Sequence, residues 1–252
     1  MQLTAHECWW DQPPANQSLS QNDVHVWCAS LDQSAPKVKR LARTLNAEER
    51  VRAERFYFDL DRKRFIVAHG LLRTILGYYS GIKPGQIQFR YSTQGKPSLA
   101  ETSNGDSIRF NLARSHGQAL FAFTLNREIG VDLESMYLIL EAEGFFNHFF
   151  STQEKVEFQA LTGHEKQEAF FRYWTCKEAY TKACGEGLAQ PFDQIDISLA
   201  AGKPAALLSV NGDVQISSRW SLQELKSAAG FAGALVVEGH SYRLDCWKWS
   251  QL

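Results

Sequence analysis

The stretch RYWTCKEAYTKACGEG, residues 172–187, predicts a helix that ends in a glycine-rich stop. Gly185 and Gly187 form the stop, because glycine readily adopts the left-handed conformation that closes a helix. Apolar or small residues recur along the helix at spacings of three and four, the period that buries one face. They are Phe171, Trp174, Thr175, Ala179 and Ala183.

Two charged residues of this helix, Glu178 and Lys182, are four residues apart and therefore lie on the same side. Lys177 precedes the glutamate directly. This set of charges suits a phosphate group held through a metal ion. The ordinary alternative is a solvated Glu–Lys pair that stabilises a helix by about 0.2–0.5 kcal/mol. On this segment alone the ordinary pair is the more common arrangement.

A second segment, IGVDLE at residues 129–134, alternates as a β-strand does. Asp132 and Glu134 share one face of that strand, and the apolar residues between them share the other. Two carboxylates on one face, joined by Glu178, make the all-oxygen site that Mg²⁺ prefers. Mg²⁺ takes its remaining ligands from water and substrate phosphates. The two segments together therefore favour a metal-phosphate site.

These two motifs carry a resemblance to a known family. GVDLE (130–134) is similar to the G-[IV]-D-[IL]-E strand of 4′-phosphopantetheinyl transferases of the surfactin-synthetase-activating type. WTCKEAYTK (174–182) is similar to their W-[ST]-x-K-E-A helix, in which a second lysine follows the glutamate by four residues. The resemblance implies an enzyme that transfers 4′-phosphopantetheine from coenzyme A to a serine hydroxyl of an apo acyl, peptidyl or polyketide carrier protein. The other product is adenosine 3′,5′-bisphosphate.

The resemblance also implies roles for the motif residues. Mg²⁺, bridging the pyrophosphate of coenzyme A, is expected on Asp132, Glu134 and Glu178. Lys182, together with Lys177, is expected to steady the charge that develops on the phosphate oxygens. Glu178, or a water on the metal that it holds, is expected to accept the serine proton. In such a phosphoryl transfer, positioning and charge neutralisation provide most of the catalysis.

Further residues match the family's contacts to coenzyme A. Gly95 and Lys96 belong to a GKP turn whose lysine lies along the phosphates in the family. Arg52 and Arg64 stand where the family has cations for the 3′-phosphate. Arg64 is the better match, because D-x-x-R opens a long helix. Asn111 keeps the asparagine of the family's F-N-[LI]-S-H-S motif.

The same motif contains the clearest departure, FNLARSHG at residues 110–117. Ala113 and Arg114 occupy the places of the Ser and His that touch phosphate in the family. One interpretation is that Arg114 supplies the phosphate donor, because its guanidinium is a permanently charged fork of N–H groups. The alternative is a loop shift that brings in the pair that follows, Ser115 and His116. We favour Arg114.

Composition bounds the remaining possibilities. At 252 residues, 44% hydrophobic and 22% charged, the chain has an ordinary globular composition. A net charge of −1 gives no global signal for nucleic acid or membrane, and the family resemblance implies a monomer. Residues 37–64 nevertheless hold ten basic against five acidic residues, an excess of +5. This run predicts either an anionic ligand or partner, or solvated helix faces.

Five cysteines, an odd number without a C-x-x-C pair, argue against a disulfide framework or a zinc site. No signal-peptide pattern opens the chain, and no apolar run reaches the length needed to cross a bilayer. We therefore expect a reducing cytoplasm. His25 is a lone histidine without a second ligand at metal-binding spacing, so a structural role is expected.

Helices then strands recur in both halves, which predicts an α+β fold of two similar lobes, residues 1–126 and 127–252. The family resemblance implies that a pseudo-twofold relates the lobes and that coenzyme A lies in the cleft between them. Capping-box patterns at Asn46 and Ser151 open two of the expected helices. The other expected helices are 61–81 and one near 137–150. The expected strands begin at 24, 87, 107, 119 and 129, and then cover 195–199, 206–210, 214–220, 231–237 and 242–249.

Two other functions fit parts of the sequence. A degenerate relative could hold a carrier protein or coenzyme A without transferring anything, and the altered 113–116 stretch motivates this reading. Retention of all three carboxylates and of Lys182 counts against it. An unrelated Mg²⁺-dependent phosphotransferase would normally carry a G-x-x-x-x-G-K-[ST] loop, which the sequence lacks.

Overall fold

The computed structural model of the chain describes residues 10–14, 18–100, 107–137, 149–185, 191–200 and 202–250. Most of the helix expected near 137–150 falls outside these ranges, as does Gly187. No helix within the described ranges is long and apolar enough to cross a membrane.

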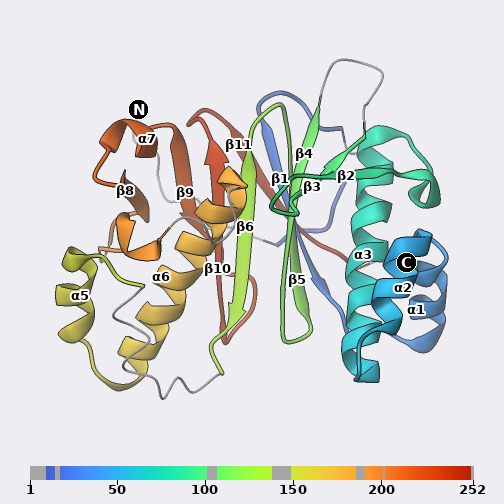
Figure 1. Cartoon of the computed structure of the whole chain (residues 1–252), viewed down its shortest axis with the longest axis horizontal. Coiled ribbons are helices and arrows are strands. Elements are labelled where there is room, and N and C mark those ends of the chain that lie inside the picture. The colour runs from blue at the N-terminus through green and yellow to red at the C-terminus, as the bar shows by residue number, and fades with distance from the viewer. Residues whose placement is uncertain are drawn as a thin grey trace.

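The first half begins with a strand and three helices and ends with a pair of long strands (Figure 1). Its elements are β1 (Asp23–Ser30), α1 (Ala35–Ala42), α2 (Ala47–Glu54), α3 (Asp59–Ser80), η1 (Pro84–Gln86), β2 (Phe89–Tyr91), β3 (Pro97–Leu99), β4 (Ile108–Ser115) and β5 (Gln118–Leu125). The expected capping box at Asn46 is present and opens α2.

The second half repeats this order. Its elements are β6 (Ile129–Ser135), α5 (Thr152–Gln159), α6 (Gly163–Cys184), η3 (Phe192–Gln194), β7 (Ile195–Ser198), β8 (Ala206–Val210), α7 (Val214–Ser217), β9 (Trp220–Glu224), β10 (Phe231–Glu238) and β11 (Arg243–Lys248). The capping box at Ser151 is present and opens α5. The predicted α+β class is therefore confirmed.

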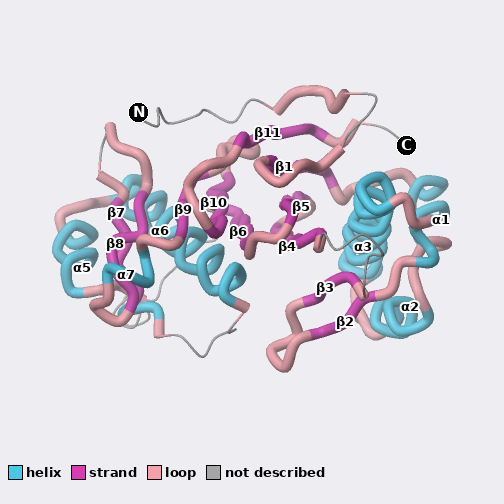
Figure 2. Tube along the Cα trace, turned by 90° about the horizontal axis from the view of Figure 1, so that it is seen from above, coloured by secondary structure: helices cyan, strands magenta, loops and turns pink. Residues whose placement is uncertain are grey.

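Strand pairing repeats as well. The first sheet has the order β11-β1-β5-β4 and the second the order β6-β10-β9. In each, the first strand of the half pairs antiparallel with the last strand of its long hairpin, β1 with β5 and β6 with β10. The small pairs β2-β3 and β7-β8 follow the long helices (Figure 2). The two halves thus share one topology, whereas the pseudo-twofold axis stays a prediction.

The layers follow from this pairing. Helices α3 and α6 lie on opposite outer sides of the sheets (Figures 1 and 2), and each packs on its own half's sheet through a separate apolar cluster. A third cluster joins the inner faces of both sheets and includes Val26, Leu120, Val131 and Leu235. Alternating residues of β6 therefore face the core, as predicted for Val131 and Leu133.

The chain's last strand departs from the repeat. Strand β11 comes from the second half but pairs parallel with β1 in the first sheet. The division into lobes at residues 126/127 remains a prediction. Strand β11 follows that division in the sequence but belongs to the sheet of the first half. Cys246 on this strand is disulfide-bonded, which departs from the argument against a disulfide framework, whereas Cys28 and Cys176 are free thiols.

One predicted strand is wrong. Residues 214–217 of the expected strand 214–220 form the short helix α7, and β9 begins only at Trp220. The Asp213 side chain caps this helix by accepting from the Gln215 N–H. An Asp before a helix is a recognised start signal, and it outweighs the apolar alternation of a four-residue segment.

Candidate functional site

The candidate site lies where α6 packs on β6. A Cβ added to Gly130 would lie 2.0 Å from the Ala179 carbonyl oxygen, so only glycine permits this close approach of strand and helix. Two residues further along β6, Asp132 is 3% exposed, and its Oδ1 accepts from Lys182 Nζ at 2.5 Å. The glycine of the GVDLE motif thus brings the predicted carboxylate and lysine together.

The three predicted carboxylates influence one another. Burial raises the pKa of Asp132, and burial together with the Asp132 charge raises the pKa values of Glu134 and Glu178. Asp132 Oδ2 is buried and has no hydrogen-bond partner. Burying like charges without full compensation is unfavourable, so this group is suited to a cation.

The carboxylates are nevertheless loosely spaced. Their oxygens do not all come within 4.8 Å of one another, and among the described residues Asp23, His25 and Asp245 form the set that does. Lys182 supplies a positive charge at Asp132.

Strand β4 holds this site from the other side. Its residues Asn111 and Ser115 face β6: Asn111 Oδ1 accepts from Val131 N at 3.0 Å, and Ser115 Oγ accepts from Ser135 N at 3.1 Å. Ser115 also donates to Glu134 Oε2 at 2.9 Å. Both predicted coenzyme A contacts therefore join the two halves of the molecule in this structure.

The Ser-His pair after the altered motif lies in a turn. His116 and Gly117 have positive φ values of 41° and 82° and connect β4 to β5, and Ser115 Oγ lies 3.2 Å from His116 Nδ1. The tight turn keeps Ser115 and His116 on the Glu134 side. Ala113, in the place of the family's serine, is buried in the core between the sheets.

Arg114 points the other way, toward the helices of the first half. Its guanidinium lies 5.8 Å from the ring centres of both Phe56 and Phe65, and that of Arg52 lies 5.6 Å from Phe65. Desolvation and the adjacent Arg52 charge lower the pKa of Arg114. Both cations therefore lie near one aromatic ring, that of Phe65.

Arg64, in contrast, already has an anionic partner. Its Nε and Nη2 donate to the two carboxylate oxygens of Asp32 at 2.8 and 2.9 Å. A Cβ on Gly117 would lie 2.6 Å from Asp32 and 2.8 Å from Arg64, so this pair is packed against the β4–β5 turn. The structure brings Arg52 and Arg114 together and leaves Arg64 in a separate ion pair.

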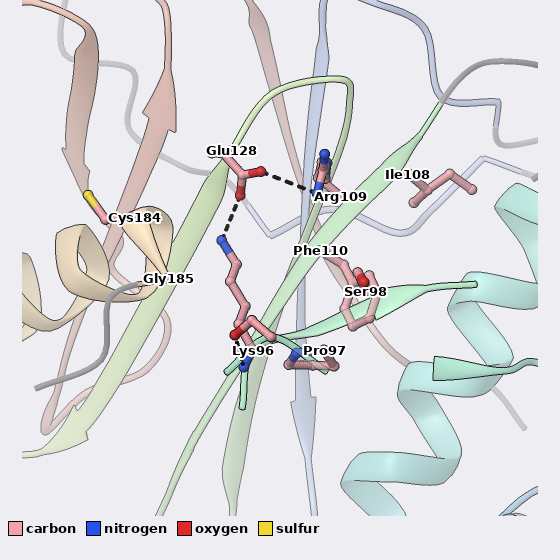
Figure 3. Close-up of a pocket in the computed structure, with 10 residues that line it drawn as sticks. Lys96, Pro97, Ser98, Ile108, Arg109, Phe110, Glu128, Cys184 and Gly185 are labelled. Atoms are coloured by element: carbon pink, nitrogen blue, oxygen red, sulfur yellow. Dashed lines mark hydrogen bonds and ion pairs between the residues drawn. The ribbon is translucent and has the colours of Figure 1, made fainter. Parts of the chain in front are cut away.

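Lys96 reaches across between the halves. Its Nζ donates to Glu128 Oε2 and to the Ala183 carbonyl oxygen of α6, both at 2.8 Å. Figure 3 shows this lysine pointing at Glu128, which also contacts Arg109. These side chains line a pocket of about 190 Å³ beside the end of α6. Gly95, with a φ of 84°, forms the turn that presents Lys96.

Lys177 does not join the site, which corrects its predicted catalytic role. The side chain is 1% exposed, and Nζ donates to Glu154 Oε2, the Phe149 carbonyl and the Phe192 carbonyl at 2.5, 2.7 and 2.8 Å. All three N–H groups of the ammonium are thus used inside the core. Consecutive helix residues point about 100° apart, so Lys177 and Glu178 lie on different faces.

Sequence reasoning missed the three carboxylates that pair with Arg64, Lys96 and Lys177. They are Asp32, Glu128 and Glu154, respectively. Glu154 carried a signal, because it is the acidic member of the capping box at Ser151. Glu128 and Asp32 stand in connecting segments, and their partners are 32 residues away in sequence. No local pattern reports such pairs.

Comparisons with known proteins identify the family of this chain. The family model of the 4′-phosphopantetheinyl transferase superfamily matches residues 128–239, and that of the 4′-phosphopantetheinyl transferase N-terminal region matches residues 30–124. The chain is 39% identical to 4′-phosphopantetheinyl transferase HetI of Nostoc sp., over 96% of this chain and 98% of the relative. It is 28% identical to a 4′-phosphopantetheinyl transferase of Bacillus subtilis, over 66% and 71%.

The chain therefore belongs to the 4′-phosphopantetheinyl transferase family, which confirms the enzyme class and reaction expected from its two motifs. Solved holo-(acyl-carrier-protein) synthases are also similar. That of Neisseria meningitidis is 22% identical with a TM-score of 0.39, over 45% of this chain and 98% of that one. That of Bacillus anthracis, in complex with CoA (3′,5′-ADP), is 23% identical with a TM-score of 0.38, over 44% and 94%.

Proposed function

We propose that this chain transfers phosphopantetheine to a carrier-protein serine in a Mg²⁺-dependent reaction, with Asp132, Glu134 and Glu178 holding the ion. The observation that carries the proposal is the buried Asp132 Oδ2, which has no hydrogen-bond partner and lies in a group of carboxylates with raised pKa values. The donors are all oxygens, the ligand type that suits Mg²⁺. When bound, Mg²⁺ neutralises charge on the pyrophosphate of coenzyme A.

The side chains of the site have separate tasks in this proposal. Lys182, one turn from Glu178 and in contact with Asp132, moves onto the phosphate oxygens as negative charge develops there. Glu178, or a water on the metal that it would hold, accepts the proton of the serine hydroxyl. Ser115 holds Glu134 in place through its hydrogen bond.

The cations of the first half bind the rest of coenzyme A. Arg52 and Arg114 flank Phe65 and take the 3′-phosphate, while Lys96 in the pocket beside α6 takes a neighbouring phosphate. Arg114 is thereby preferred to His116 for the altered motif. A monomer is part of this proposal, because one chain supplies both sides of the site. A reducing cytoplasm is proposed from the free thiols of Cys28 and Cys176, against which the disulfide-bonded Cys246 counts.

The test is intact-mass analysis of apo acyl carrier protein incubated with this chain, coenzyme A and Mg²⁺. With the wild-type enzyme, the carrier protein is expected to gain the mass of one phosphopantetheine. EDTA is expected to prevent this gain. Glu178→Gln is expected to slow transfer by about 10²–10⁴-fold, the typical contribution of a general base. Glu165→Gln, an exposed position at the start of the same helix, serves as the matched control.

Three outcomes contradict the proposal. Transfer by Glu178→Gln at the rate of Glu165→Gln would remove Glu178 from the chemistry. Transfer that persists in EDTA would remove the metal. Binding of coenzyme A without any mass gain on several carriers would instead favour a binding-only protein.

A further inference from the structure

A second group of polar side chains lies at the start of the parallel pair β1 and β11, apart from the carboxylates of the candidate site. Asp23 and His25 stand two residues apart on β1, and Asp245 faces His25 across the strand pair. One ligand atom from each of the three comes within 4.8 Å of the others. Asp23 is 6% exposed and His25 is 2% exposed.

One nitrogen of the His25 ring has a partner and the other does not. Nδ1 lies 2.9 Å from the hydroxyl oxygen of Tyr79. Nε2 is buried without a hydrogen-bond partner, 4.0 Å from Asp23 Oδ2 and 3.7 Å from Asp245 Oδ2. These separations are too long for hydrogen bonds. They are close to the separation of about 3.4 Å between two ligand atoms on a tetrahedral ion with bonds of about 2.1 Å.

We propose that Asp23, His25 and Asp245 bind a divalent transition-metal ion of the Zn²⁺ class. The ligands are His25 Nε2 and one carboxylate oxygen from each aspartate. Zn²⁺ takes imidazole and carboxylate ligands together, whereas Mg²⁺ and Ca²⁺ take oxygen ligands. With its proton on Nδ1 and held by the Tyr79 oxygen, the ring directs the lone pair of Nε2 into the group. An outer hydrogen bond of this kind fixes the tautomer of a metal-binding histidine.

Arg243 supplies the positive charge of this group in the metal-free chain. Its Nη2 lies 3.1 Å from Asp23 Oδ1, and its Nε lies 3.0 Å from Asp245 Oδ2. The Arg243 side chain is 70% exposed, so it is free to turn into solvent when a dication enters. Because the ligands come from both strands, the bound ion fastens the last strand of the chain to the first sheet.

The experiment is equilibrium dialysis of the full chain against Zn²⁺ in excess Mg²⁺, which occupies the all-oxygen group. Wild type is expected to retain one Zn²⁺ per chain, and His25→Gln and Asp245→Asn are expected to lose it. Asp59→Asn, which removes an exposed aspartate paired with Arg62, is expected to retain it. Arg243→Gln is expected to bind Zn²⁺ about two- to fivefold more tightly, because an exposed competing ion pair is lost.

Co²⁺ in place of Zn²⁺ identifies the ligands by visible absorption. Bands of nitrogen and oxygen ligation support the site, whereas a thiolate charge-transfer band assigns the ion to a cysteine and overturns it. Failure of wild type to retain zinc, or equal retention by Asp245→Asn, also overturns the proposal. His25→Gln counts only if its circular dichroism matches wild type. If the circular dichroism of His25→Gln differs from wild type, the zinc retention of Asp245→Asn, a change at a half-buried residue, decides the outcome.

Discussion

Helices α3 and α6 occupy equivalent places in the two halves and carry the same buried device. Both are 22 residues long and end at a left-handed glycine, Gly81 and Gly185. The fifteenth residue of each is a buried cation, Arg73 in α3 and Lys177 in α6. Each cation binds the capping-box glutamate of the preceding short helix and a carbonyl of the short turn that follows the long helix.

In the first half, Arg73 donates to Glu49 at 2.7 Å and to the Pro84 and Ile87 carbonyls. In the second half, Lys177 donates to Glu154 and to the Phe149 and Phe192 carbonyls. We call each of these arrangements a helix clamp. The halves differ just beyond it, since Thr74 and Tyr78 of α3 stand at the places of Glu178 and Lys182 in α6. The scaffold is repeated, and the groups proposed to react are carried by one copy.

The largest expected effect tests the clamps themselves. Arg73→Met and Lys177→Met are each expected to lower the free energy of unfolding by about 3–5 kcal/mol, because each leaves a buried glutamate without its cation. Urea denaturation followed by circular dichroism measures this, with the exposed Lys63→Met as control. A Lys177→Met chain with wild-type stability and abolished transfer would return Lys177 to catalysis.

A smaller effect is expected from the cations that distinguish the first half. Arg52→Ala is expected to raise the KM for coenzyme A about tenfold, the size of one charge-assisted contact of about 1.5 kcal/mol. The KM for the carrier protein and the midpoint of unfolding are expected to stay unchanged. Arg55→Ala, at the end of the same helix, is the control in the same steady-state assay. An equal rise in both variants would indicate general attraction by the basic helix instead.

The smallest effect concerns the cost in folding stability of the Glu178 carboxylate on α6. The pKa of Glu178 is raised in the folded chain, so its ionisation opposes folding as pH rises through the folded pKa, and it has no such effect below the unfolded value. Glu178→Gln in EDTA is therefore expected to be more stable than wild type by about 1 kcal/mol at pH 8, or about 2–4 °C in Tm.

Differential scanning fluorimetry at two pH values measures this difference. At pH 4, where the wild-type carboxyl is also protonated, the two chains are expected to have the same Tm. A gain of equal size at both pH values would point to altered packing rather than to charge.

The sequence predicts those parts of the site whose signals are local. The alternation of β6 places Asp132, and the helical period of α6 places Glu178 and Lys182 against it, because both depend on neighbours within a few residues. The match to the family motifs then supplies the reaction. Capping boxes correctly mark the starts of α2 and α5.

The features that the sequence does not predict depend on contacts between residues far apart in the chain. Lys177 is adjacent to Glu178, yet its burial depends on Glu154, 23 residues earlier. The ion pair of Arg64 with Asp32 and the parallel pairing of β11 with β1 likewise depend on how the chain folds back. The helix clamp does have a sequence trace, a capping-box glutamate followed by a cation 24 or 23 residues later. Its two copies differ in every residue type except that glutamate.

Because β11 returns to the first sheet, a break of the chain between its two halves separates β11 from its partner β1. Two connections join the halves, residues 126–128 and residues 239–242. Separate expression of residues 1–126 would leave β1 as an open sheet edge with unpaired N–H and C=O groups, a template for aggregation. The second fragment would carry an unpartnered β11. A split version of this protein is therefore expected to reassemble only when both fragments are made together.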